Sequence, residues 1–329
     1  MPTVIDSMLY FNEIELFCAR YDLLKDTVDR FCIFEAGTTF TGLPKSGNFW
    51  GDLERIGFEV DQSRISYLLV DSLPDRRTAE TSGEHTYELQ MLSGLDAGLA
   101  SQWFKEHLSR ELLKRTFSSE KNDTVVLVSD IDEIPTPSAI SLACSMIAEA
   151  PDTIVSIQMK DYVGSVSCDT GKIWEGTFAM TKDKAMTVCL SAVRSLDAHT
   201  AKRAFAGVVQ IANGGWHFSS FGGRAAVKRK IMAWGHQELN RWDIRFFLGA
   251  NIALGKDIFG RDIFSRNKNK EGTTSGPRPS DYFQSGRVYS ECLGRDDANV
   301  QLNDHLLRYL FIFLQFGRRV FGRLGLLGM

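Results

Sequence analysis

The chain has 329 residues, a formal net charge of −3, 43% hydrophobic residues and 24% charged residues. This length allows one large domain, or one domain with an appended piece, which buries a sizeable core without disulfide or metal staples. The balanced charge argues against a general nucleic-acid-binding protein, and no stretch approaches the roughly 20 apolar residues that span a bilayer.

The cysteines and the N-terminus indicate a cytoplasmic protein. The six cysteines form no CxxC pair, and none lies at a zinc-binding distance from a histidine, so we expect free thiols in a reducing compartment. The first ten residues include Asp6 and lack the basic start and apolar run of a signal peptide.

The first 150 residues alternate between strand and helix patterns. We expect strands over 3–11, 28–36, 65–70 and 124–129, and helices over 12–25, 84–117 (interrupted near Gly98) and 137–150. The run over 124–129 is almost entirely apolar and β-branched, which is typical of a central strand buried on both faces. The alternation predicts an α/β fold with a mostly parallel sheet flanked by helices.

The remaining residues predict a less regular second half. We expect strands over 153–159, 162–167 and 174–180, a glycine-bearing loop over 218–223, and helices over 225–234 and 241–254. We therefore divide the chain into one main domain over 1–265, a flexible polar loop region over 266–304 and a C-terminal helix over 305–329.

The C-terminal segment 305–329 is basic and amphipathic. It carries Arg308, Arg318, Arg319 and Arg323 among apolar residues and has no acidic residue. Such a segment either lies on an anionic membrane surface or docks on the protein core as a final helix. The first alternative predicts peripheral contact with the inner face of a membrane.

Two aspartates follow the predicted central strand. Asp130 and Asp132 lie at the carboxyl edge of the sheet, where α/β proteins bind ligands. If the backbone turns there, both carboxylates can face one Mn²⁺ or Mg²⁺ ion, because hard cations prefer oxygen ligands. Such an ion stabilises negative charge on a leaving phosphate group. The alternative is a solvated turn in which Pro135 leads into the next helix.

A second group of candidates lies in and beside a predicted small-residue loop. His217 is a candidate third metal ligand or phosphate contact, and the alternative is a buried histidine bonded to backbone. Trp216 either stacks on a sugar ring or a nucleobase, or belongs to the core. The pair Gly222 and Gly223 either lets the backbone approach a ligand closely or makes a turn.

A third group follows the first two strands and would face a nucleotide. Asp6, Asn12 and Glu13 are candidate contacts for the base and ribose, although Asn12 also fits the cap of the following helix. Glu35 ends the second strand and could contact ribose hydroxyls. Lys45, in a turn-rich loop, either reaches a phosphate or is solvated.

Several motifs together resemble glycosyltransferase family 17, which includes the β-1,4-mannosyl-glycoprotein β-1,4-N-acetylglucosaminyltransferase. The matching segments, in the right order over about residues 3–265, are Val4-Ile5-Asp6, Phe11-Asn12-Glu13, Glu35-Ala36-Gly37, Thr39-Phe40-Thr41-Gly42, Val128-Ser129-Asp130-Ile131-Asp132-Glu133-Ile134-Pro135, Gly215-Trp216-His217-Phe218-Ser219, Phe221-Gly222-Gly223 and Gly255-Lys256-Asp257-Ile258-Phe259.

The resemblance implies a GT-A-like fold, a donor of the UDP-GlcNAc type and inversion at the anomeric carbon. Inversion needs a general base, for which a carboxylate is the usual group. The candidates are Glu133, Glu175 and Glu238, with Glu238 preferred because it lies with His236 beyond the Gly-Trp-His segment. The acceptor stays open between a glycan and a lipid-linked sugar.

Two other classes of protein remain possible from the sequence. A metal-dependent phosphoesterase or nucleotidyltransferase could use the same acidic pair, with Asp6 and Asp161 as further ligands. A non-catalytic sugar-binding protein could retain the fold without the base.

Overall fold

The computed structural model describes residues 2–45, 47–93, 95, 100–164, 166, 169–195, 208–253, 256–259 and 277–283. The predicted loop region 266–304, apart from 277–283, and the predicted helix 305–329 lie outside the described residues. None of the helices within the described ranges combines the length and apolarity that crossing a bilayer requires.

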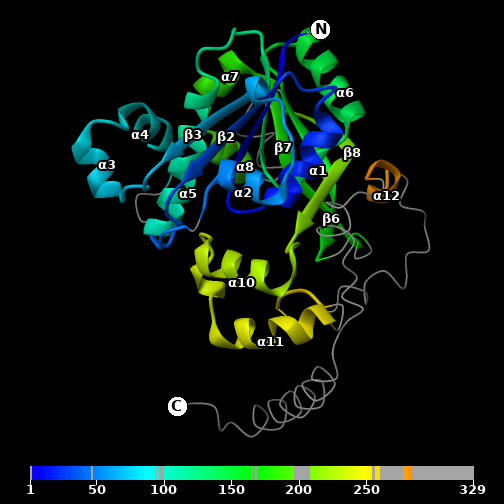
Figure 1. Ribbon diagram of the computed structural model, residues 1–329. Helices are drawn as coiled ribbons and strands as arrows, with labels where there is room; N and C mark the ends of the chain where they lie inside the picture. Colours follow the sequence, from blue (N-terminus) through cyan, green and yellow to red (C-terminus); the bar gives the residue numbers. More distant parts are fainter. Residues whose placement is uncertain are drawn as a thin grey trace, which may run out of the picture.

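One eight-stranded sheet forms the centre of the molecule (Figure 1), with the strand order β3-β2-β1-β4-β7-β6-β8-β5. Its strands are β1 (Val4–Leu9), β2 (Arg30–Ala36), β3 (Ile65–Val70), β4 (Val125–Asp130), β5 (Glu133–Pro135), β6 (Ile154–Val163), β7 (Asp169–Thr181) and β8 (Val208–Ser219). The pairings from β3 to β4 and between β6 and β8 are parallel, and the other three are antiparallel. The predicted α/β class is confirmed.

Helices cover both faces of this sheet. The described helices are α1 (Ile14–Leu24), α2 (Phe49–Ile56), α3 (Arg76–Ser82), α4 (Thr86–Leu92), α5 (Ser101–Leu113), α6 (Pro137–Glu149), α7 (Lys182–Thr187), α8 (Leu190–Ser195), α10 (Gly223–Ala233), α11 (Trp242–Ala253) and α12 (Pro279–Tyr282). Helices α1, α2 and α6 share one apolar core with the sheet, and α5, α7 and α8 share a second core on the opposite face.

The two cores follow from the pattern of apolar residues along the strands. Val125 and Leu127 of β4 belong to the first core, whereas Val126 and Val128 belong to the second. Because successive side chains of a strand point to opposite faces, an unbroken apolar run suits a strand covered on both sides. The strand that ends at the Asp130-Asp132 segment is therefore fixed from both faces.

Helices α10 and α11 form a separate unit below the sheet in Figure 1. They pack on each other through a small apolar cluster of Val227, Ile231, Leu248 and Ile258. The connection from β8 contains three residues with positive φ, namely Ser220 (60°), Gly222 (90°) and Gly223 (74°). This reversal of the chain turns the α10–α11 unit across the carboxyl edge of the sheet.

The structure corrects several sequence-based expectations. Residues 154–163 form one strand where two were predicted, and β5 and most of β8 were missed. Trp216 and His217 lie inside β8 rather than in a loop. The residue that precedes α1 is Glu13, so Asn12 does not cap that helix, and Asn12 has a positive φ of 61°.

Candidate active site

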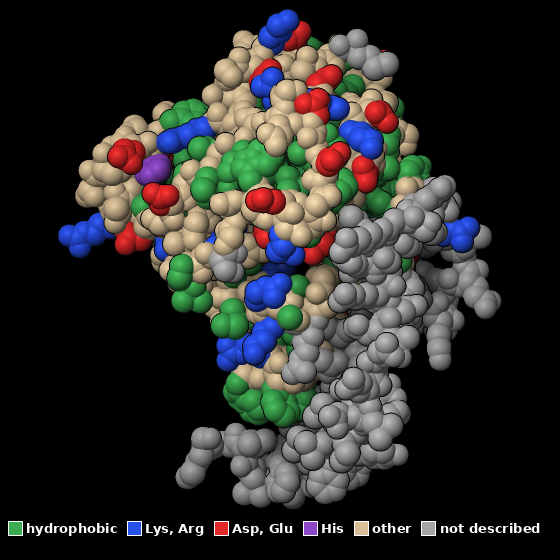
Figure 2. Space-filling view, in the orientation of Figure 1, with side chains coloured by type: hydrophobic (Ala, Val, Ile, Leu, Met, Phe, Trp, Pro, Cys, Tyr) green, Lys and Arg blue, Asp and Glu red, His purple; other side chains and the backbone are tan. Residues whose placement is uncertain are grey.

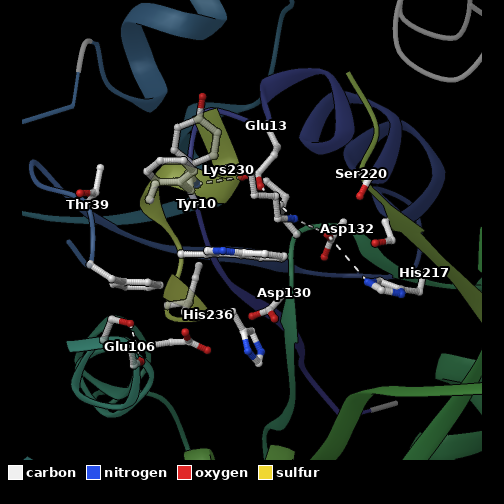
Figure 3. Close-up of a pocket in the computed structure, with 18 of the residues that line it drawn as sticks. Tyr10, Glu13, Thr39, Glu106, Asp130, Asp132, His217, Ser220, Lys230 and His236 are labelled. Atoms are coloured by element: carbon white, nitrogen blue, oxygen red, sulfur yellow. Dashed lines mark hydrogen bonds and ion pairs between the residues drawn. The ribbon is translucent and has the colours of Figure 1, made fainter. Parts of the chain in front are cut away.

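A cavity of about 870 Å³ opens where the carboxyl ends of β1 and β4 face the α10–α11 unit. Six of the sequence-predicted residues line it: Glu13, Lys45, Asp130, Asp132, His217 and Asp161, the last predicted as a ligand in the phosphoesterase alternative. Figure 3 shows Asp132, Lys230 and His217 directed toward one another in this space, with Asp130 set apart from them. The structure thus brings the predicted acidic pair and the predicted histidine into one site.

The backbone that carries the two aspartates is held by a buried arginine, Arg20 of α1. Its Nε and Nη2 donate to the two carboxylate oxygens of Asp6 at 2.7 and 2.6 Å. Its Nη1 donates to the backbone oxygens of Asp130 at 3.0 Å and Glu133 at 2.7 Å. Both Arg20 and Asp6 are 0% exposed. Asp6 therefore orients Arg20 and does not line the cavity, which contradicts its predicted contact with the donor.

Asp130 is paired with arginines. Arg194 Nη2 lies 2.7 Å from Asp130 Oδ2, and Arg110 Nη2 lies 3.6 Å from the same atom. Burial acts to raise the pKa of Asp130, but Arg194 and then Arg110 outweigh it and lower the pKa to about 2. Asp130 is therefore a carboxylate at any physiological pH.

Asp132 lies between a lysine and the histidine. Lys230 Nζ of α10 is 2.7 Å from Asp132 Oδ2, and His217 Nε2 is 3.9 Å from the same oxygen. Burial acts to raise the pKa of Asp132, but the charges of Lys230 and His217 outweigh it and lower the pKa. Figure 3 shows Lys230 and His217 approaching Asp132 from opposite sides.

His217 is itself fixed by two neighbours. Its Nδ1 lies 2.9 Å from Asp161 Oδ1, and its ring stacks on Trp174 with centroids 4.2 Å apart and an interplanar angle of 14°. Burial acts to lower the pKa of His217, but the hydrogen bond to Asp161 and the charge of Asp132 raise it. The Asp161 contact leaves Nε2 as the ring atom that faces the cavity.

The Asp132 and His217 pair fits a divalent cation of the Mn²⁺ or Mg²⁺ class. An imidazole oriented through its other nitrogen by a carboxylate is the usual arrangement of a histidine ligand. Within the described residues no three acidic, histidine or cysteine side chains gather into a complete metal site. A cation here would take its remaining ligands from water and substrate phosphate, as Mg²⁺ commonly does, and would compete with Lys230 for Asp132.

Glu13 lies at the other side of Lys230. Its Oε1 is 3.5 Å from Lys230 Nζ, and its Oε2 accepts a hydrogen bond of 3.0 Å from the Phe11 amide. Burial raises the pKa of Glu13 to about 7, assisted by Asp132 and opposed by Lys230. Glu13 lines the cavity, and its predicted contact with the donor stays a prediction. It lies at one end of a row of alternating charges formed with Lys230 and Asp132.

The two residues predicted for ribose and phosphate bind each other. Lys45 Nζ lies 2.6 Å from Glu35 Oε1, and both side chains are almost fully buried. Glu35 Oε2 also accepts hydrogen bonds from the Phe49 amide at 2.9 Å and the Tyr67 hydroxyl at 2.7 Å. Glu35 thus serves the fold and does not line the cavity, while Lys45 contributes to its wall.

Four other predicted residues lie outside the cavity. Trp216 is 0% exposed within an aromatic core, and its Nε1 donates to the Pro277 carbonyl at 3.1 Å. Asn12 borders a much smaller neighbouring hollow. Gly222 and Gly223 supply the positive-φ backbone at the start of α10.

Neither preferred base is placed for acid–base chemistry. Glu133 is 0% exposed, and both of its carboxylate oxygens accept hydrogen bonds from Arg194, at 2.8 and 2.9 Å. Trp174 Nε1 and the Asp130 amide also donate to it, at 2.7 and 2.8 Å. Glu238 is exposed outside the cavity, and its hydrogen bond to His236 lowers its pKa. The third candidate, Glu175, also lies outside the cavity lining and accepts from Gln158 and Gln210.

Sequence reasoning missed the basic residues of the site. Arg20, Arg110, Arg194 and Lys230 come from four different helices and look like ordinary helix-surface residues in the sequence. The sequence indicated these basic residues only indirectly. Two aspartates separated by one residue at a buried sheet edge require positive charges from elsewhere in the chain. Lys230 also stands within the same stretch of chain as the Phe221-Gly222-Gly223 motif.

An acidic loop at the carboxyl edge of parallel strands, with a fixed histidine and a lysine around a large cavity, lies where α/β proteins bind ligands. The model of glycosyltransferase family 17 matches residues 1–251, and the chain belongs to this family. The chain is therefore a glycosyltransferase. A search of curated protein sequences gives no match.

Several solved structures are distantly similar to the chain. Glucosyl-3-phosphoglycerate synthase from Mycobacterium tuberculosis, solved with Mn²⁺, UDP and phosphoglyceric acid, has 11% identity over 65% of this chain and 69% of that chain, with a TM-score of 0.31. Galactosyltransferase LgtC, solved with donor and acceptor sugar analogues, has 11% identity over 63% of this chain and 72% of that chain, with a TM-score of 0.31. S. aureus TarS (1–349) has 10% identity over 82% and 74%, with a TM-score of 0.33. These overlaps carry no residue roles across.

Proposed function

We propose that this glycosyltransferase moves a sugar, GlcNAc in the first instance, from a UDP-linked donor to a carbohydrate or lipid-linked acceptor with inversion at the anomeric carbon. The family assignment supports sugar transfer, and the family resemblance suggests the donor and the inversion. The observation that carries the proposal is the meeting of Asp132, His217 and Lys230 in one cavity.

Each of these three groups has a use in breaking a bond to a diphosphate. Asp132 and His217 would hold a divalent cation, which supplies a Lewis acid for the negative charge of the departing diphosphate. Lys230 presents a second positive charge to the same space. Arg20 and Arg194 keep the Asp130-Asp132 loop in position, so that its backbone stays in place when the donor binds.

The acceptor hydroxyl must lose a proton during an inverting transfer. Glu133 and Glu238 do not line the cavity, so a different carboxylate would act as the base. Asp130 and Asp132 belong to the acidic loop and Asp161 orients His217, which leaves three other carboxylates in the lining. These are Glu13, Glu106 and Asp257. Replacing each by its amide, and comparing transfer with slow donor hydrolysis by water, distinguishes a base from a donor contact. A base variant loses transfer much more than donor affinity.

The direct test is donor hydrolysis in the absence of acceptor. The protein is incubated with Mn²⁺ and a panel of UDP, GDP and CMP sugars, and released nucleotide is measured. We expect UDP release from UDP-GlcNAc, and its loss in Asp132→Asn.

Asp123→Asn serves as the matched control, because Asp123 lies outside the cavity lining. Hydrolysis of another nucleotide sugar in preference to UDP-GlcNAc would refute the donor assignment. Cleavage of a simple phosphodiester without release from any sugar donor would refute the whole proposal. Proton NMR of the first glycoside product reports whether the anomeric configuration is inverted.

A further inference from the structure

The outer surface of α11 combines large apolar side chains with basic ones. Trp242 is 70% exposed and Phe246 is 52% exposed, and their rings lie 6.4 Å apart. Residues four apart lie on the same side of a helix, so the two rings form one row. Ile244 and Leu248, two positions further on in each case, pack instead against α10. The exposed row is therefore not part of the core of this unit.

Basic residues flank the aromatic row. Arg241, directly before α11, has a 58% exposed side chain, and its guanidinium pairs with Asp243 at 2.7 Å. Arg245 within α11 is half-buried and donates to Asn240 Oδ1 at 2.7 Å. Lys228 and Arg229 of α10 are also exposed. In Figure 2, a hydrophobic patch lies at the lower end of the coloured surface, where Figure 1 places α11, and Lys and Arg side chains gather directly above this patch.

The charge of this segment is opposite to that of the rest of the chain. Residues 222–253 contain six Lys and Arg against two Asp and Glu, whereas the other residues contain 32 against 39. The segment thus has a net charge of +4 in a protein of net charge −3. One of these basic residues, Lys230, is paired with Asp132 in the cavity. The excess of the remaining basic residues favours attraction to an extended negative surface.

We propose that Trp242 and Phe246, with Lys228 and Arg241 beside them, dock the enzyme on an anionic membrane surface. Tryptophan and phenylalanine insert at the boundary between headgroups and acyl chains, and basic residues next to them bind anionic headgroups. The charge separation favours this occupant over a second copy of the chain, because two copies would bring two basic segments together.

The docking face belongs to the same small unit as one wall of the cavity. Helix α10 contributes Lys230 and Trp234 to the cavity lining, and α11 packs directly on α10. Docking through α11 therefore places the cavity close to the membrane, which suits an acceptor whose sugar is carried by a lipid. The proposal stands on the surface of α11 and does not depend on the identity of the donor.

The test is flotation of the full-length protein with vesicles at physiological ionic strength. Vesicles of phosphatidylcholine alone are compared with vesicles that contain 30% phosphatidylglycerol, a proportion that we choose at roughly the anionic content of a charged leaflet. We expect binding to the anionic vesicles, with at least roughly tenfold weaker binding in Trp242→Ser/Phe246→Ser. Lys228→Gln/Arg241→Gln removes no apolar contact, and we expect it to weaken binding by roughly tenfold as well.

Leu142→Ser is the matched control, because Leu142 is a 48% exposed apolar residue on α6, away from α11. Its binding should equal that of the unchanged protein. The same variants are measured after deletion of 305–329, so that binding by that basic segment is separated from binding by α11.

Three results would overturn the proposal. The first is absence of binding to anionic vesicles. The second is binding by both double variants that is as strong as that of the unchanged protein. The third is a change of oligomeric state in Trp242→Ser/Phe246→Ser without any loss of vesicle binding. Donor hydrolysis in solution, measured in parallel, should be unchanged in all these variants, so failure of docking and failure of the proposed reaction give different results.

Discussion

Arg20 is the residue on which the geometry of the acidic loop depends most. It is fully buried, pairs with Asp6 and donates to three carbonyls of the Asp130–Glu133 segment. Removing one partner of a buried ion pair leaves the other charge uncompensated, at a cost of about 3–5 kcal/mol. We therefore predict that Arg20→Met lowers the free energy of unfolding by about this amount, measured by urea denaturation.

A double variant separates the charge pair from the support of the loop. In Arg20→Met/Asp6→Leu the uncompensated carboxylate is gone, so most of the stability should return, while donor hydrolysis stays low because the loop carbonyls are still unheld. The partly exposed pair of Arg30 and Glu120 supplies the control, since Arg30→Met should cost about 1 kcal/mol or less. An Arg20→Met protein of unchanged stability would contradict this account.

Glu13 predicts a pH dependence of stability. Its pKa is about 7 in the folded protein, above the ordinary glutamate value of 4.5. Burial and the negative charge of Asp132 raise the pKa, and together they outweigh the positive charges of Lys230 and Lys45, which lower it. Between these two pH values the folded form holds a proton that the unfolded form has released. Glu13 therefore lowers stability as pH rises through this window, by roughly 3 kcal/mol.

Glu13→Gln removes the titrating group and tests this sign. The difference in unfolding free energy between variant and unchanged protein should grow in favour of the variant from about pH 5 to pH 8. Urea denaturation at a series of pH values measures it. A constant difference across the series would show that Glu13 titrates normally.

Individual site residues could be predicted from the sequence only where a pattern placed them. Asp130 and Asp132 follow an unmistakable buried strand, and the family motif marked His217. Glu133 lies in the same motif as the two aspartates. Its two carboxylate oxygens, however, both accept hydrogen bonds from Arg194, which is remote in sequence. Hydrogen-bond saturation is a property of the folded surroundings, so sequence spacing does not distinguish a free carboxylate from an occupied one.

At the scale of elements, strands with regular patterns were predictable and glycine-bearing strands were not. The pair Gly214 and Gly215 looks like a loop, but it lies within β8 because the chain of β5 packs against it. A Cβ at Gly215 would lie 2.4 Å from the backbone oxygen of Ile134 and 2.8 Å from Pro135 Cα. The glycine is a packing requirement between strands, and only the tertiary structure reveals it.

This close approach predicts the effect of Gly215→Ala. Because the methyl group meets backbone, β5 must move away from β8, and the register that pairs Glu133 with His217 is lost. Displacement of about 1 Å at the site can cost roughly 100-fold in rate, so we expect at least that loss of donor hydrolysis. The unfolding midpoint should fall as well.

Gly51→Ala provides the control for adding a methyl group. Gly51 lies within α2, and the nearest atom to its new Cβ is Asn48 Oδ1 at an ordinary 3.6 Å. Alanine is favoured over glycine in a helix, so this variant should keep its activity and its stability or gain some. Equal behaviour of the two alanine variants would refute the packing argument.

At the scale of the whole molecule, two bodies meet at the cavity. The sheet supplies Asp130, Asp132 and His217, while the α10–α11 unit supplies Lys230 across a connection rich in positive-φ residues. The sequence predicted both bodies as segments, but not that they face each other. That relation depends on the backbone reversal after β8, for which the glycine pair is an ambiguous signal.

This arrangement predicts that donor binding joins the two bodies. With UDP and Mn²⁺ at about 100 times the dissociation constant, the folded state should gain about 2.7 kcal/mol, seen as a higher melting temperature. Because Lys230 and Asp132 both face the bound diphosphate in the proposed function, amide hydrogen exchange should slow in α10 as well as around residues 130–132. Lys230→Gln should retain the protection at 130–132 and lose that in α10. Protection confined to the sheet edge in the unchanged protein would mean that α10 takes no part in holding the donor.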